Sequence, residues 1–223
     1  MKRSWKVIVV SLCIILGAAV VVYASTNYEK EFLAGEYLKS ATESNPDEVQ
    51  GGQKKIAAIY NGQEILMSVV QYQRNMNIMR DGEAAQGYES DFDIVNRIVE
   101  SMILVEEAER QGLAATEDEI EEMVDMARRS YEIPEGKEML DAYCEGAGIS
   151  IEEYFELIRE QAPRTIARQK LKDAFGKEYC EKHGLEFTKV NPPEEMVEAE
   201  NDYISDLFEK HKNEIEYFIP IDK

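Results

Sequence analysis

Cysteine, histidine and proline are scarce in this sequence, and their scarcity narrows the chemistry that the protein can perform. Its 223 residues include three cysteines, two histidines and six prolines. No Cys-x-x-Cys pair occurs, which disfavours a thiol redox enzyme. A zinc site needs three or four ligands, and only Cys180 and His183 lie close together in the chain. We therefore expect no metal site and no cofactor.

The usual signatures of catalysis are also missing. The sequence has no glycine-rich phosphate loop and no Gly-x-Ser-x-Gly elbow. Cys180 and His183 could share a helix face as a thiol–imidazole pair. Their polar surroundings, EYCEKHG, favour an exposed helix end instead. We expect a protein that is not an enzyme.

Positive charge is the third scarcity. There are 25 Lys and Arg against 45 Asp and Glu, which gives a formal net charge of −20. Nucleic acid and anionic lipid headgroups are therefore poor partners, whereas basic or unfolded polypeptides are better ones. Runs such as EDEIEEM and PPEEMVEAE are interpreted as solvated helix faces. Weak calcium binding is the alternative, although no EF-hand pattern occurs.

One long hydrophobic run is present near the start of the chain. Residues 7–24 carry no charge and follow Lys2, Arg3 and Lys6. As a helix the run would be about 27 Å long, close to the thickness of a bilayer core. Residues 1–24 are therefore a transmembrane anchor or, because small residues stand near Ala24, a cleaved signal peptide. Both interpretations place the remainder outside the cytoplasm, as a single-pass membrane protein or a secreted one.

Residues 25–53 are polar and end in NPDEVQGGQ, so we expect a juxtamembrane linker. One helical stretch, EKEFLAGEYLKSA, interrupts it, in which Phe32, Leu33, Tyr37 and Leu38 could share a face.

A β-hairpin is predicted next. Asn61-Gly62 is a strong type I′ turn signal, with Ile56–Tyr60 and Gln63–Met67 as the arms. An isolated hairpin is only marginally stable. The alternating stretch IEYFIPI, residues 215–221, is a candidate third strand.

The sequence between these strands predicts helices. Capping-box spacing at Ser68, Thr116 and Ser150 opens three of them. Asp91 is expected to cap a buried helix over residues 92–111, and Pro134 to start a short one that ends near Gly146. The helix from Ser150 runs to Gly184, with a kink or break expected near Pro163. A last helix is expected over residues 194–212.

The order of these phrases resembles the N-terminal domain of the SurA/PrsA family of extracytoplasmic chaperones. Three stretches over residues 54–183 carry the resemblance: IAAIYNGQEILMSVVQYQ, then VNRIVESMILVEEAERQGLAATEDEIEEMV, then GISIEEYFELIREQ. It implies a mainly α fold, a helical bundle with a small hairpin, over residues 54–223. It also implies that the C-terminal segment packs back onto the hairpin.

The sequence departs from that family at one point. Many relatives insert a parvulin prolyl-isomerase domain after the long helix, where this chain has only LEFTKVNPPE. Prolyl isomerase activity is therefore not expected, and the resemblance implies binding of unfolded or exported polypeptides.

Methionines and cysteines are the remaining candidates for function. Seven of the nine methionines fall between Met67 and Met139, and flexible Met side chains suit surfaces that accept varied apolar partners. Core filling is the ordinary alternative. Met76, Met79, Met123 and Met126 are the predicted client-binding residues. Cys144 and Cys180 could form a disulfide or remain separate thiols.

We therefore expect a membrane-tethered, chaperone-like protein that binds polypeptides without covalent chemistry. Two alternatives remain open: a docking module for one membrane or envelope partner, and an isomerase relative that has lost its catalytic domain.

Overall fold

The computed structural model describes residues 28–42, 55–81 and 90–220, and this part of the chain is mainly helical with one small sheet. The predicted hydrophobic run 7–24 lies outside it. Among the described helices, none has the length and apolar character to cross a membrane. The elements are α3 (Tyr28–Thr42), β1 (Ile56–Tyr60), β2 (Gln63–Leu66), α4 (Met67–Asp81), α5 (Asp91–Arg110), α6 (Glu117–Glu132), α7 (Pro134–Ala147), α8 (Ile151–His183), α9 (Glu194–His211), η4 (Lys212–Glu214) and β3 (Ile215–Tyr217).

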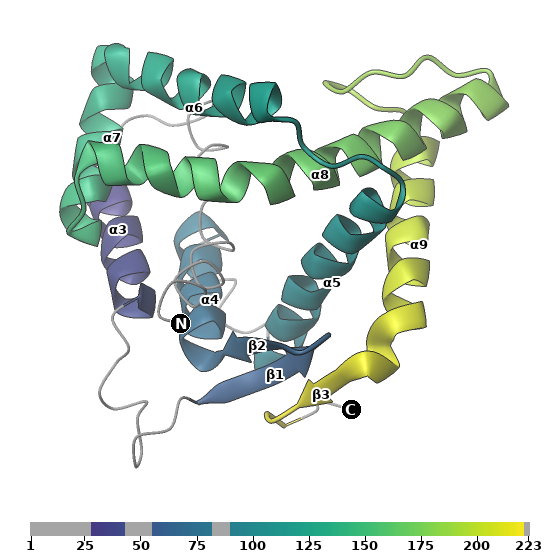
Figure 1. The fold of residues 1–223 in the computed structure, drawn as a ribbon, viewed down its shortest axis with the longest axis horizontal. Coiled ribbons are helices and arrows are strands. Elements are labelled where there is room, and N and C mark those ends of the chain that lie inside the picture. Colours follow the sequence, from purple (N-terminus) through teal and green to yellow (C-terminus); the bar gives the residue numbers. More distant parts are fainter. Residues whose placement is uncertain (1–27, 43–54, 82–89, 221–223) are drawn as a thin grey trace.

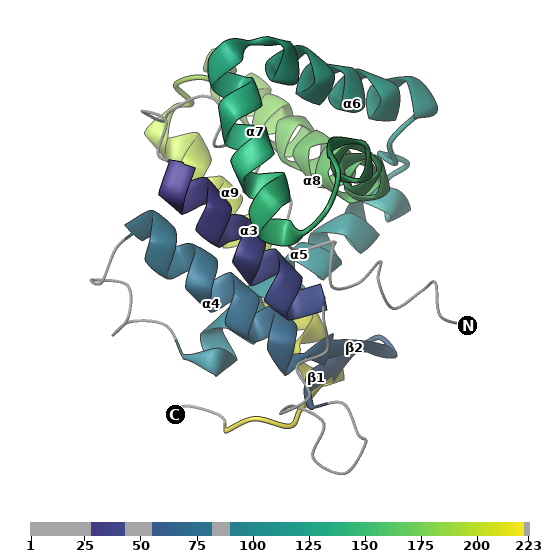
Figure 2. The same cartoon turned by 90° about the vertical axis from the view of Figure 1, so that its left-hand side faces the viewer.

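The long helix α8 crosses the molecule opposite the sheet (Figure 1). Helix α6 packs along it, α7 and α3 lie near its first turns, and α9 leaves from its far end. Helix α5 descends from α8 toward the strands and also packs on α9. Turned by 90°, α3 lies beside α4 and is crossed by α7 (Figure 2).

The hairpin forms as predicted at its turn. Asn61 and Gly62 have φ angles of 47° and 73°, which are the positive values that a type I′ turn requires. The second arm is shorter than expected, because β2 ends at Leu66 and Met67 already begins α4. The Met67 amide donates to the Lys55 carbonyl at 3.0 Å. Ser68 therefore lies inside the first turn of α4 instead of capping it.

The predicted third strand is confirmed. The sheet order is β2-β1-β3, and β3 runs antiparallel to β1 with Tyr217 opposite Ala58. The Phe218 amide extends the pairing by donating to the Ala57 carbonyl at 2.9 Å. The Tyr217 hydroxyl donates to Asn96 of α5 at 2.5 Å. The end of the chain thus completes the sheet that the hairpin starts.

Most helix starts follow the sequence signals. Thr116 and Ser150 each form a full capping box with a glutamate three residues later. The cap of α5 was predicted one residue late, because Ser90 and Asp93 make its capping box while Asp91 is the first helical residue. A serine hydroxyl both accepts from the helix and donates to the carboxylate, so it satisfies this motif better than Asp91 does.

Pro163 does not break α8, contrary to the prediction. The helix is continuous from Ile151 to His183, and Pro163 is exposed on its surface. Proline removes one backbone hydrogen bond, but water can reach the freed carbonyl at an exposed position. Buried residues before and after it, such as Ala162 and Ala167, hold both halves of the helix against the core.

Helix α3 belongs to the packed core, although its sequence predicted a linker. The predicted helix is confirmed, and Ala34, Leu38 and Ala41 are buried, whereas Leu33 is 40% exposed. A Cβ atom at Gly35 would lie 2.1 Å from the Tyr143 carbonyl oxygen. Only glycine permits so close an approach between α3 and α7. The predicted domain boundary at residue 54 therefore separates elements that pack together.

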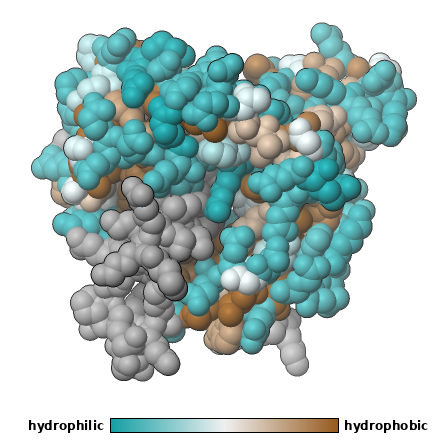
Figure 3. Space-filling model, in the orientation of Figure 1, coloured by the Kyte–Doolittle hydropathy of each residue, from teal (hydrophilic) through white to brown (hydrophobic). Residues whose placement is uncertain are grey.

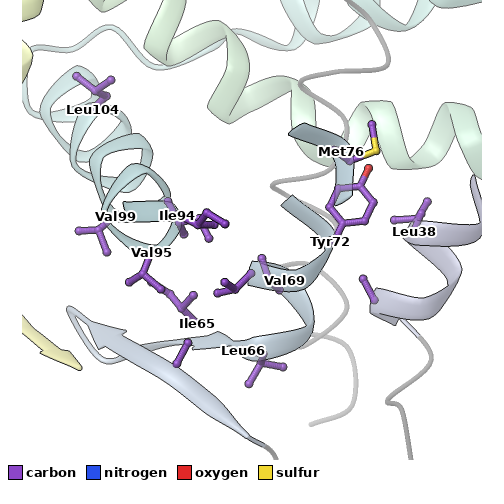
Figure 4. Close-up of a cluster of buried hydrophobic side chains, with 14 of the residues drawn as sticks. Leu38, Ile65, Leu66, Val69, Tyr72, Met76, Ile94, Val95, Val99 and Leu104 are labelled. Carbon is purple, nitrogen blue, oxygen red and sulfur yellow. The ribbon is translucent and has the colours of Figure 1, made fainter. Parts of the chain in front are cut away.

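The hydrophobic core lies where α3, α4, α5 and the sheet meet (Figure 4). Helix α5 is buried on several sides as expected, and its core residues Ile94, Val95, Ile98 and Val99 are at most 1% exposed. Burial of such side chains stabilises a fold by roughly 1.5–3 kcal/mol each. This core fixes the positions of α5 and α8, and the candidate site lies on α8 and on α9, which packs against both helices.

Candidate functional site

The four methionines predicted to bind clients do not form one surface. Met76 is only 5% exposed and belongs to the core. Met79 and Met123 are partly buried against that core, and Met126 is 56% exposed. Because Met76 and Met79 pack inward from α4, they fill the interior. Of the four, only Met126 remains freely available on the surface.

A different group of side chains, on α8 and α9, stacks its rings in a row. Phe175, Tyr179 and His183 are spaced by one helical turn, so their rings stack along one face of α8. The ring centroids of Phe175 and Tyr179 are 6.2 Å apart, and those of Tyr179 and His183 are 4.2 Å apart. Tyr203 of α9 stacks on Phe175 at 4.8 Å. We call these four residues the aromatic row.

The aromatic row is partly open to solvent. Tyr203, Phe175 and Tyr179 are half-buried, and His183 is exposed. Figure 3 shows a mainly hydrophilic surface on which hydrophobic residues appear as separate patches. A row of stacked rings supplies a flat face that apolar side chains can cover, and rings that are held in place lose little entropy on binding.

Hydrogen bonds from α5 hold the first ring of the row. The Tyr203 hydroxyl lies 3.4 Å from Glu107 and accepts from Gln111 at 3.4 Å. Arg110 donates two hydrogen bonds to the same carboxylate, from Nε at 2.6 Å and from Nη2 at 2.5 Å. The hydrogen bonds that Arg110 donates hold the pKa of Glu107 down to about 2, although partial burial opposes the shift. Glu107 is therefore charged at neutral pH, and it holds the row in place through the Tyr203 hydroxyl.

The loop after α8 packs on the helix at Gly176, next to Phe175. Phe187 lies over Gly176, where a Cβ atom would approach its ring to 2.7 Å. The Lys177 ammonium lies 5.9 Å from the centre of the same ring. In this way the ten-residue stretch LEFTKVNPPE is fixed against α8 by its aromatic side chain.

The predicted disulfide is not formed. Both Cys144 and Cys180 are buried free thiols. Cys144 lies next to Tyr143, whose ring packs 5.6 Å from Tyr154 near the start of α8. Cys180 lies 26 residues beyond Tyr154 on α8, about 39 Å along the helix axis. A disulfide needs Cα atoms within about 7 Å, so the fold keeps the two thiols apart.

Burial raises the pKa of the Cys144 thiol to about 11, and nearby carboxylates add to the shift. The structure therefore makes this cysteine a poor nucleophile. Within the described ranges no cluster of three metal-ligating side chains occurs. His183 uses its ring to stack on Tyr179 and leaves Cys180 on the buried side of the helix.

The acidic runs divide into paired and solvated carboxylates. Arg159 of α8 pairs with Glu121 of α6, and Lys170 binds Glu119 at 3.0 Å. Asp118 and Glu122 are exposed on the other side of α6. The interpretation of these runs as a charged helix face thus holds for α6, with three carboxylates (Glu117, Glu119 and Glu121) also joining it to α8.

Sequence reasoning did not identify the aromatic row. Phe175, Tyr179 and Tyr203 were not among the predicted client-binding residues. The signal was present, because Phe, Tyr and His at positions i, i+4 and i+8 must share a helix face.

Comparisons with known proteins do not add to this description: no family model, no curated protein and no solved structure matches the chain.

Proposed function

We propose that this protein binds unfolded or exported polypeptide segments outside the cytoplasm, tethered to the membrane by its N-terminal hydrophobic run. Binding needs no covalent chemistry. The aromatic row is the observation that carries this proposal, because it offers a fixed, half-buried apolar face. The resemblance of the element order to SurA/PrsA N-terminal domains supports it.

The charge distribution favours the same class of partner. A net charge of −20 repels acidic ligands at long range. The same charge keeps a complex with an aggregation-prone polypeptide in solution. Apolar segments of a client would contact the rings of the row, and basic segments would be attracted by the solvated carboxylates of the protein. Weak contacts of this kind suit partners of varied sequence.

The test compares variants by fluorescence anisotropy with a labelled, chemically unfolded polypeptide titrated with the full chain. We expect Tyr179→Ser to weaken binding at least fivefold, because it removes the central ring of the row. Met126→Ser removes an exposed apolar side chain on α6 and Leu33→Ser one on α3. Both serve as matched controls and should leave affinity within twofold.

If Met126→Ser weakened binding and Tyr179→Ser did not, the binding surface would lie on α6 and the aromatic row would have no role in it. If one folded partner bound while several unfolded polypeptides did not, the protein would be a dedicated docking module instead.

A further inference from the structure

The middle of α8 contains a buried polar side chain that the fold leaves unsatisfied. Gln161 is only 2% exposed, and within the described chain neither its Oε1 nor its Nε2 has a hydrogen-bond partner. Buried amides are nearly always paired with protein, water or a ligand. Gln161 therefore marks a place where a polar partner is required.

Two arginines share this face of the helix. Arg164 and Arg168 follow Gln161 by three and seven residues, so all three side chains project toward one side of α8. Arg168 donates from Nη1 to the Ser101 hydroxyl of α5 at 2.5 Å, whereas its Nε is enclosed without a partner. We call these three residues the Gln161–Arg168 face.

Neither arginine is neutralised by a carboxylate of the described chain, even though the protein carries 45 acidic residues. On α5, burial raises the pKa of Glu100, and the charges that oppose this shift are those of Lys172 and Arg97. Lys172 in turn donates to Glu200 at 2.9 Å. Burial lowers the pKa of Arg168, and the nearby charge of Arg164 lowers it further.

This face takes part in the contact between α8 and α5, because Arg168 bonds to Ser101. Near its start α8 packs on α7 through Tyr154, and farther along it binds α9 through Lys172. The Gln161–Arg168 face lies between these two contacts, where α8 crosses the molecule (Figure 1). It thus belongs to the same helix as the aromatic row.

We propose that the Gln161–Arg168 face binds a carboxylate group of a polypeptide client. The guanidinium groups of Arg164 and Arg168 hold the carboxylate, because the planar fork of arginine matches its two oxygens. Gln161 pairs with a peptide group of the same client. Seven helical residues span about 10.5 Å, which corresponds to about three extended client residues. The inference rests on the proposed function and specifies its ligand.

The experiment uses the full chain and three fluorescein-labelled peptides of one apolar sequence. The first has a free C-terminal carboxylate, the second a C-terminal amide, and the third an amide with one internal glutamate. We expect the free acid to bind at least tenfold more tightly than the plain amide. An equal gain for the glutamate peptide would show that side-chain carboxylates are also accepted.

Substitutions identify the residues that produce the preference for a free carboxylate. Arg168→Gln and Arg164→Gln should each abolish the preference for the acid while preserving binding of the amide. Arg129→Gln, at an exposed position on α6, is the matched control and should change nothing. Thermal unfolding checks that each variant is folded, and Arg164→Gln suffices for the test if Arg168→Gln does not fold.

Equal affinity of the acid and the amide for the unmodified protein would overturn this inference and leave polypeptide binding intact. A preference that persists in both arginine variants would also overturn it. If no peptide bound at all, the proposed function itself would fail, and the carboxylate site with it.

Discussion

Individual residues decide how closely the helices of this protein approach. Gly35 and Gly146 bring the backbones of α3 and α7 into direct contact, and a Cβ atom at Gly146 would lie 2.0 Å from the Phe32 carbonyl oxygen. Neither glycine was predicted to matter, because a close approach depends on the partner helix and not on local sequence. Capping residues are the opposite case. Thr116 and Ser150 were predicted correctly because their bonding partners lie within three residues.

Gly35→Ala should destabilise the protein by about 2 kcal/mol. Its methyl group would overlap backbone atoms of α7, and overpacking of this kind costs about 1–3 kcal/mol, which outweighs the ~1 kcal/mol that alanine adds to helix propensity. Denaturant unfolding measures the change. Ser40→Ala, on the exposed side of α3, is the control and should have little effect. Unchanged stability of Gly35→Ala would mean that α3 does not pack on α7 in this way.

Glu107 makes stability depend on pH at the acid end. Its folded pKa of about 2 is lower than its ordinary value of 4.5, so the unfolded chain takes up the proton first as the pH falls. The stabilisation is complete above pH 4.5 and is lost as the pH drops toward 2. Because Arg110 is largely exposed, the contribution is reduced to about 1–2 kcal/mol.

Glu107→Gln should therefore flatten the fall of stability between pH 4.5 and 2, as measured by thermal unfolding at a series of pH values. Glu109→Gln, on the exposed side of α5, should leave the fall of stability between pH 4.5 and 2 as steep as in the unmodified protein. A variant curve parallel to that of the unmodified protein would show that Glu107 does not stabilise the fold through its charge.

At the scale of elements, the prediction was most accurate where a periodic pattern met a strong turn signal. The hairpin at Asn61-Gly62, the buried helix α5 and the return of β3 to β1 all follow such patterns. The prediction failed for the four methionines, because apolar residues have the same helical spacing whether they face a core or an exposed groove. Met76 and Met126 are equally apolar in sequence and differ only in what packs against them.

Removal of β3 tests how far the chain end supports the fold. Truncation after Glu214 deletes the pairing with β1 and the Tyr217–Asn96 hydrogen bond, leaving an isolated hairpin. We expect a loss of at least about 3 kcal/mol, because Ile215 also leaves the core. Glu216→Gln, at an exposed position of β3, should cost almost nothing. Unchanged stability of the truncated chain, measured in denaturant, would contradict the role of β3.

Helix α6 is attached to α8 partly by charge. Arg159 contacts both Glu117 and Glu121, and its side chain is 29% exposed. Arg159→Gln should cost about 1 kcal/mol at low ionic strength and less in 1 M salt, because mobile ions screen partly exposed pairs. The comparison is made by unfolding in the two buffers. A loss independent of salt would indicate packing of the side chain rather than its charge.

At the scale of the whole molecule, the described chain is one packed unit in which its first helix, α3, and its last strand, β3, pack against the middle of the chain. Helix α3 docks on α7 and α4, and β3 completes the sheet. The packing of α3 on α7 and α4 was not predicted, because residues 25–53 are mostly polar and α3 buries mainly small residues instead of a broad apolar stripe. A fragment that begins at residue 52 should therefore expose the α7 surface, bind a hydrophobic dye and unfold at a lower temperature than the full chain.

The most direct measurement of the central claim is light scattering from two unrelated, chemically unfolded proteins diluted into buffer with the full chain at several molar ratios. The proposed binding of polypeptides by the aromatic row predicts that scattering from both clients is suppressed near equimolar amounts. It also predicts that Tyr179→Ser suppresses scattering less well than the unmodified chain. Undiminished scattering for both clients, with a protein shown to be folded, would contradict the proposal.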